Sequence, residues 1–172
     1  RKVFRAMDDL LPQVDALQRM RAAARYAGTP ALEAGDLAQN PDAAQWVRDA
    51  LSHFWGGPRL SENPLLGLRV VEKALNENNG NPVNALRAVL KNAIEQIKPD
   101  GQRKFTGEWL LYNILELKFL QGQKVRDVAM RLAVSEADLY RKQRVAVEEV
   151  LKRITQMEGQ MDVSPENEQP LS

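Results

Sequence analysis

Apolar residues recur at intervals of three and four along most of the chain, which is the periodicity of amphipathic helices. This pattern predicts helices over residues 3–27, 30–38, 41–54, 64–79, 82–97 and 107–120, followed by two more between Gly122 and Ile154. Pro12 is expected to break the first of them near Asp8 and Asp9. No segment alternates apolar and polar residues at period two, so the predicted fold class is all-α.

The helix starts are marked by a repeated pair of residues. Asn40-Pro41, Asn63-Pro64 and Asn81-Pro82 each place an N-cap residue before a proline at the first helical position. Thr106 is expected to cap the next helix, and Gly122 to end it. The segments between these starts show no internal repeat. We therefore expect a helical array of short, well-capped helices joined by tight loops.

The stretch from Gly122 to Ile154 has a different build. It reads as a short helix, a tight turn over Ala133–Glu136, and a long C-terminal helix for which Ser135 is the N-cap. A small core and an inward stripe are predicted from Val128, Ala129, Leu132, Val134, Leu139, Gln143, Ala146 and Val150. This arrangement is that of a helix-turn-helix domain, whose second helix enters a DNA major groove.

Glu108 to Ile154 resembles the region-four helix-turn-helix of sigma-70-type sigma factors and related regulators. The match comprises LELKFLQG (115–122), Val128-Ala129, Leu132, the turn 133–136, Leu139 and Ala146. The chain departs from the family at Ala133, where the family takes glycine, and at Gln143, where it prefers a large apolar residue. It also carries acids at 136 and 138. The resemblance implies a transcription regulator of a bacterial cytoplasm that binds duplex DNA. RNA polymerase or other protein domains would be further partners. Nothing before Phe105 resembles the remaining regions of a complete sigma factor.

The candidate DNA-binding residues lie on both helices of the motif. At the start of the second helix they are Ser135, Glu136, Ala137, Tyr140, Arg141, Lys142 and Arg144. An arginine can pair bidentately with guanine, which contributes about 1–3 kcal/mol of discrimination. Lys124, Arg126 and Arg131, on or beside the first helix, are placed to meet phosphates, which position a protein without specifying sequence.

The charge balance leaves a second hypothesis open. The 24 Lys and Arg nearly cancel the 23 Asp and Glu, and the motif itself holds eight bases against five acids. The alternative is a helical protein-interaction or oligomerisation module of a multidomain signalling protein, without DNA contact. Val147, Leu151 and Ile154 form a stripe that could serve a homodimer, an interface between domains, or packing against residues 3–20.

Other function classes lack their signatures. The sequence has no cysteine, phosphate-binding loop, zinc-ligand spacing or nucleophile elbow, so we expect no enzyme, metal or cofactor. No apolar run approaches the roughly 20 residues of a membrane span. His53-Phe54-Trp55 is interpreted as core and helix end rather than as an aromatic binding site.

These patterns divide the chain into three parts. We expect an N-terminal helical region over 1–99, the helix-turn-helix domain over 100–157, and a disordered acidic tail over 158–172. The tail holds four acids, no base and two prolines. Because the chain starts at Arg1 and ends in this tail, we expect it to be a piece of a longer protein.

Overall fold

A computed structural model describes residues 34–102 and 106–161 of the chain, and all regular structure within them is helical. The eight α-helices and two irregular helices are α2 (Ala34–Gln39), α3 (Ala43–Ser52), α4 (Pro58–Ser61), the 3-10 helix η1 (Pro64–Gly67), α5 (Arg69–Glu77), α6 (Pro82–Ile97), α7 (Gly107–Ile114), the π-helix η2 (Leu115–Leu120), α8 (Val125–Leu132) and α9 (Glu136–Met161). The all-α prediction is confirmed for this part of the chain. The helix predicted over 3–27 lies outside it.

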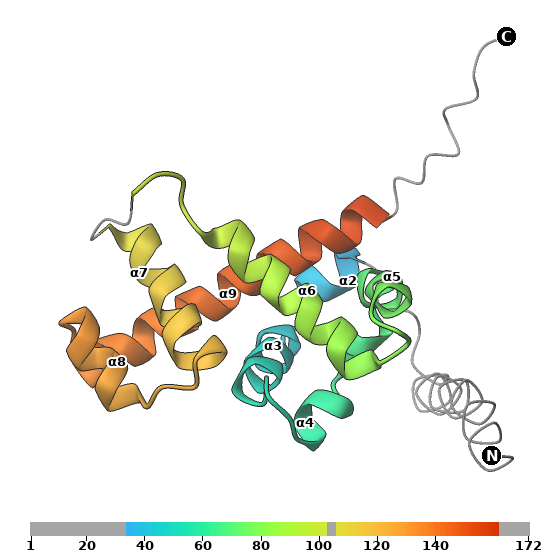
Figure 1. Ribbon diagram of the computed structural model, residues 1–172. Coiled ribbons are helices and arrows are strands. Elements are labelled where there is room, and N and C mark those ends of the chain that lie inside the picture. The colour runs from blue at the N-terminus through green and yellow to red at the C-terminus, as the bar shows by residue number, and fades with distance from the viewer. Residues whose placement is uncertain (1–33, 103–105, 162–172) are drawn as a thin grey trace, which may run out of the picture.

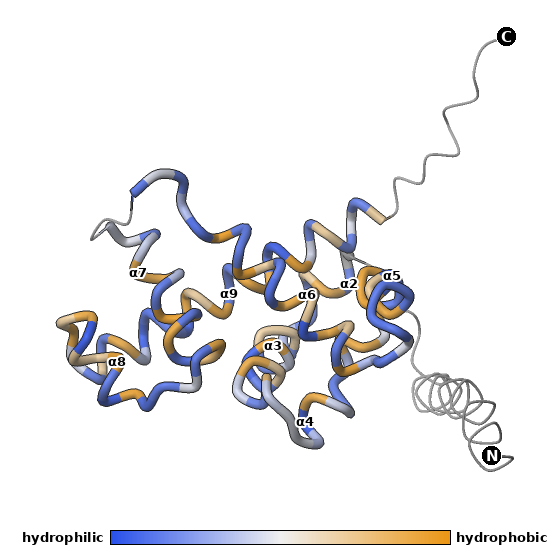
Figure 2. Tube along the Cα trace, in the orientation of Figure 1, coloured by the Kyte–Doolittle hydropathy of each residue, from blue (hydrophilic) through white to orange (hydrophobic). Residues whose placement is uncertain are grey.

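The long helix α9 is the element on which the others pack. Its 26 residues contact α2, α3, α5, α6, α7 and α8, and Figure 1 shows it passing behind α7 and α6 toward α2. Apolar and polar residues interchange along α6 and α9 in Figure 2, as an amphipathic helix requires. No helix in the described residues is both long and apolar enough to cross a membrane.

One hydrophobic cluster joins the two predicted domains. It combines residues of α3, α5 and α6 with Val147, Val150 and Ile154 of α9, and Leu151 packs against its edge. The stripe for which we considered a homodimer therefore packs within the chain, as an interface between its N-terminal helices and α9. A smaller cluster lies between the end of α7, η2, α8 and the start of α9.

The three Asn-Pro starts differ in outcome. At Asn81 the prediction is confirmed, because its side chain accepts the N–H groups of Val83 and Asn84 and α6 begins at Pro82. At Asn40 the side-chain oxygen accepts only the N–H of Asp42, at 2.9 Å, and forms a turn. Helix α3 therefore begins at Ala43, two residues later than predicted.

The single helix predicted over 64–79 is wrong. Asn63 accepts the N–H of Leu65, but the segment that follows is the 3-10 helix η1. Leu68 is extended (φ −72°, ψ 143°), and α5 begins only at Arg69. The start of α5 is capped by a residue from the far end of the chain, because the fully buried carboxylate of Glu158 accepts the N–H groups of Arg69 and Val70.

The same residue corrects the predicted tail. Glu158 was assigned to a disordered segment, but α9 continues through it to Met161. Its carboxylate also accepts a hydrogen bond from the Arg69 side chain at 3.2 Å. Glu158, one of the four acids on which the predicted disorder rests, thus holds α9 against α5. The remainder of the predicted tail, 162–172, lies outside the described residues.

Candidate functional site

A tight turn joins α8 to α9 where the sequence predicts it, over residues 133–135. Ala133 adopts the left-handed conformation (φ 55°, ψ 43°) at the end of α8. Its N–H donates to the carbonyl of Met130, and the N–H of Val134 donates to that of Ala129 at 3.0 Å. An L-residue with a Cβ in this conformation costs roughly 1 kcal/mol relative to glycine. The chain therefore tolerates this strain in order to turn.

Ser135 then starts α9. Its hydroxyl accepts the backbone N–H of Asp138 at 3.1 Å, which is the N-cap contact expected from the sequence. The first residue of α9 is Glu136. The long helix thus begins one residue after the cap, and its first turns project from the motif with a defined orientation.

A small core sets the angle between α8 and α9. Leu139 packs with Val128 and Ala129 of α8 and with Ile114 and Leu117 of the preceding helices. The remaining predicted core residues, Leu132 and Val134, are partly buried beside them. The inward stripe is also confirmed, since Gln143, Ala146 and Val150 are buried.

The polar member of that stripe has a partner that sequence reasoning missed. The side-chain oxygen of Gln143 accepts a hydrogen bond from Nζ of Lys118, on η2. Lys118 Nζ also lies 5.3 Å from the centroid of the Tyr140 ring. Burial, and then the positive charge of Arg48, lower the pKa of Lys118 below its ordinary value. A single lysine within the apolar run LELKFL was the available signal.

Most of the predicted residues at the start of α9 are exposed. Ser135, Glu136, Ala137, Tyr140, Arg141 and Arg144 are exposed, and Lys142 is half-buried at the side, as predicted. Neither Arg141 nor Arg144 forms an ion pair within the described part of the chain. Two arginines therefore project freely next to a buried Leu139.

The predicted phosphate-contacting residues lie on the other helix of the motif. Lys124 is the N-cap residue of α8, and Arg126 and Arg131 lie on its exposed arc. Met130 lies between these two arginines on that arc, with 73% of its side chain exposed. The structure thus places cations on both α8 and α9. On α8, however, the exposed apolar side chain of Met130 separates Arg126 from Arg131.

The interpretation of His53-Phe54-Trp55 as core is only partly right. Phe54 is buried, whereas Trp55 is 68% exposed. The indole N–H of Trp55 donates to the carbonyl of Leu120 at 3.2 Å, and its ring packs edge-on against Phe54. Trp55 therefore bridges the end of α3 to the end of η2 at the surface.

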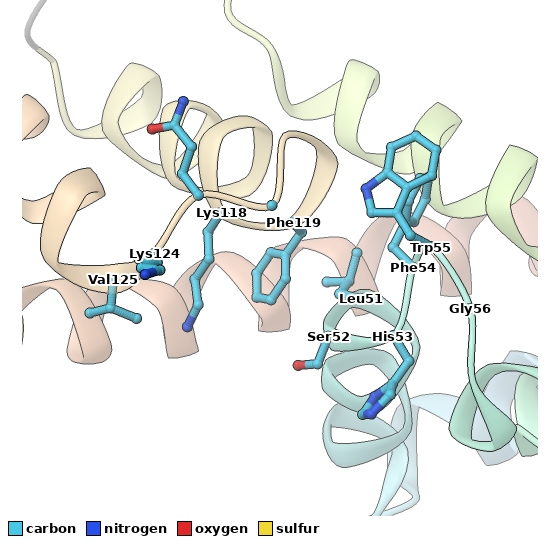
Figure 3. Close-up of a pocket in the computed structure, with 12 residues that line it drawn as sticks. Leu51, Ser52, His53, Phe54, Trp55, Gly56, Lys118, Phe119, Lys124 and Val125 are labelled. Atoms are coloured by element: carbon cyan, nitrogen blue, oxygen red, sulfur yellow. The ribbon is translucent and has the colours of Figure 1, made fainter.

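Two depressions separate α3 from the helix-turn-helix. The first is a cleft of about 740 Å³ between the end of α3 and the segment that leads into α8, and its walls include Ser52, His53, Lys118 and Lys124 (Figure 3). The second is a groove of about 410 Å³ between α3 and α9. Its lining residues are Pro41, Ala44, Gln45, Arg48, Tyr140, Gln143, Arg144, Val147 and Glu148.

No family model, curated protein or solved structure matches this chain.

Proposed function

We propose that this chain is a DNA-binding transcriptional regulator, or the regulatory part of a larger protein. In this proposal α8 and α9 are its helix-turn-helix, and the first turns of α9 enter the major groove of duplex DNA. The observation that carries the proposal is the distribution of residues around the start of α9. Leu139 is buried against α8, whereas Arg141 and Arg144 are exposed. At 3.6 residues per turn these two arginines lie within about 60° of each other around the helix.

The geometry of the turn supports the same proposal. Ala133 and Ser135 end one helix and start the next within four residues, and Leu139 packs the two together. This is how helix-turn-helix proteins present the N-terminal residues of a recognition helix to base edges. Arg141 or Arg144 would pair with guanine, Glu136 would accept from a cytosine amino group, and Ala137 leaves room for close approach.

The cations of α8 would serve a different purpose in the complex. Lys124, Arg126 and Arg131 would contact phosphates and set the position of α9 on the duplex. Contacts of this kind release counterions, so the affinity is expected to fall steeply as salt increases.

The test is a titration of a labelled mixed-sequence duplex, followed by fluorescence anisotropy over a series of salt concentrations. We expect the wild type to bind at low salt with an affinity that falls steeply as salt increases, and Arg141→Ala with Arg144→Ala to bind about tenfold more weakly or worse. The matched control is Lys73→Ala with Lys91→Ala, which removes two exposed charges from α5 and α6. A double mutant that binds like this control would contradict the assignment of α9 as the recognition helix.

One observation favours a second candidate function. Met130 exposes a large apolar side chain on the outer face of α8, where it could contact a protein. A helical interaction module without DNA contact would use this face. Absence of duplex binding by the wild type at low salt would overturn the DNA proposal and favour this one.

A further inference from the structure

Four cationic side chains line the two depressions between α3 and the segment that contains η2, α8 and α9. The net charge of the whole chain is only +1. Nevertheless, the cleft beside α8 is lined by Lys118 and Lys124, with no carboxylate among its lining residues. The groove beside α9 is lined by Arg48 and Arg144, with Glu148 as its one carboxylate. We refer to the surface formed by Lys118, Lys124, Arg48 and Arg144 as the basic trench.

The cleft and the groove adjoin each other. Lys118 lines the cleft, and its amino group donates to Gln143, which lines the groove. Tyr140, whose ring lies 5.3 Å from the same amino group, also lines the groove. In Figure 3, Lys118 and Lys124 lie across the opening from Ser52 and His53. Helix α3 therefore forms one wall of the trench, and the helix-turn-helix forms the other.

Two positive charges of the trench, those of Lys118 and Arg48, lie close enough to repel each other. Burial and the nearby charge of Arg48 lower the pKa of Lys118, so the two groups interact unfavourably when both are protonated. Arg48 is exposed and forms no ion pair among residues 34–102 and 106–161. An anion bound between α3 and α9 would relieve this repulsion.

The trench lies next to the surface that the proposed function assigns to DNA. Tyr140 and Arg144 belong both to the candidate recognition residues and to the wall of the groove. Arg141 lies about 60° further around the helix, on its open side. A duplex that meets Arg141 and Arg144 would therefore have α3 along one flank. An α-helix seated in a major groove has a phosphate backbone on each side of it.

We propose that the basic trench binds the phosphate backbone of the duplex, and that Arg48 of α3 is a DNA-contacting residue outside the helix-turn-helix. This inference rests on the proposed function and extends the interface into the N-terminal helices. A phosphate would accept hydrogen bonds from the Arg48 guanidinium, which suits a tetrahedral oxyanion. Lys118 and Lys124 would contribute charge from the opposite wall.

The experiment compares Arg48→Ala, Arg48→Lys and Lys91→Ala with the wild type on the same labelled duplex. The slope of log affinity against log salt measures the number of phosphates neutralised, with about 0.9 lost per contact. We expect Arg48→Ala to lower that slope by about 0.9 and to weaken binding severalfold at low salt. Arg48→Lys is expected to retain most of the slope. Lys91→Ala removes an equal charge from an exposed position on α6 and is expected to leave the slope unchanged. Circular dichroism of each variant verifies that the helices are intact.

The outcomes separate this inference from the proposed function. If the wild type binds and the Arg141 and Arg144 double mutant loses affinity, but Arg48→Ala keeps the wild-type slope, the trench is not a phosphate site and the proposed function stands. If the wild type fails to bind duplex DNA at low salt, both are overturned. If Arg48→Ala and Lys91→Ala lower the slope equally, the effect belongs to overall charge, and the assignment of Arg48 is wrong.

Discussion

The carboxylate of Glu158 accepts the backbone N–H of Val70 at 2.9 Å, which joins two residues that are 88 positions apart. The other oxygen of this carboxylate accepts the N–H of Arg69 at 3.1 Å. These two N–H groups belong to the first turn of α5, whose own N-cap residue, Leu68, supplies no side-chain acceptor. The end of α9 therefore completes the start of α5.

This contact predicts a large effect from a residue far from the candidate site. Glu158→Ala would leave two N–H groups at the start of α5 without their acceptor, so we expect the free energy of unfolding to fall by about 2–3 kcal/mol. Glu148→Ala, an exposed acid on the same helix, is the control and is expected to change it by less than about 0.5 kcal/mol. Urea denaturation of both variants gives the comparison. Equal effects would show that the buried cap contributes little.

The strained turn gives a prediction of opposite sign. Ala133 has a φ of 55°, so Ala133→Gly is expected to raise the free energy of unfolding by up to about 1 kcal/mol. Ala137→Gly, four residues further on and in the first turn of α9, is expected to lower it by a smaller amount, because glycine adds backbone entropy to the unfolded chain. Thermal denaturation of the two variants measures both shifts. If glycine destabilises at both positions, the left-handed turn is not strained.

The parts of the fold that could be predicted from the sequence depend on contacts between near neighbours. Asn81, Thr106 and Ser135 each accept an N–H two or three residues ahead, and all three were recognised as caps. The left-handed turn at Ala133 and the inward position of Leu139 follow from spacing within one motif.

Apart from the late start of α3, which follows from the local turn at Asn40, the errors involve residues whose partners are distant in the sequence. The break at Leu68 coincides with a cap from Glu158, 89 residues beyond Arg69. Trp55 lies at the surface, and the partner of its indole N–H is the carbonyl of Leu120, 65 residues away. The candidate site divides in the same way. Spacing within one motif predicts α9 and its exposed arginines. The approach of Arg48 to Lys118 depends on how α3 packs, and no local pattern encodes it.

Lys118 predicts a pH dependence of stability. Burial, and secondarily the charge of Arg48, hold the pKa of Lys118 below 10.5, its ordinary value. At pH values between the pKa of Lys118 in the folded chain and 10.5, the unfolded chain binds more protons at this site than the folded chain does. The contribution of Lys118 to the free energy of unfolding therefore rises with pH across this window. Lys118→Met lacks the titrating group. The free energy of unfolding of the wild type is therefore expected to rise relative to that of the variant between neutral pH and about pH 10. Urea denaturation across this range measures it, and a constant difference would contradict the pKa shift.

The shared cluster around α9 predicts that the helix-turn-helix depends on the N-terminal helices for its stability. Val147, Val150, Ile154 and Met157 of α9 are buried in a cluster with α3, α5 and α6, whereas the cluster inside the motif has only five buried members. We therefore expect the whole chain to unfold in a single transition, with coincident midpoints by far-UV circular dichroism and by tryptophan fluorescence.

A fragment of residues 106–161 extends this test to the motif alone. It would remove the α3, α5 and α6 side of the cluster that buries those four apolar side chains and keep only its members on α7, η2 and α9. Full burial of an apolar side chain of this kind contributes about 1.5–3 kcal/mol. The fragment is therefore expected to melt well below the whole chain or to be only partly helical at room temperature. Two separate transitions in the whole chain, together with a fragment as stable as the second of them, would instead show two independent domains. Residues 106–161 would then fold without α3, and the α3 wall of the basic trench could be removed without unfolding α9.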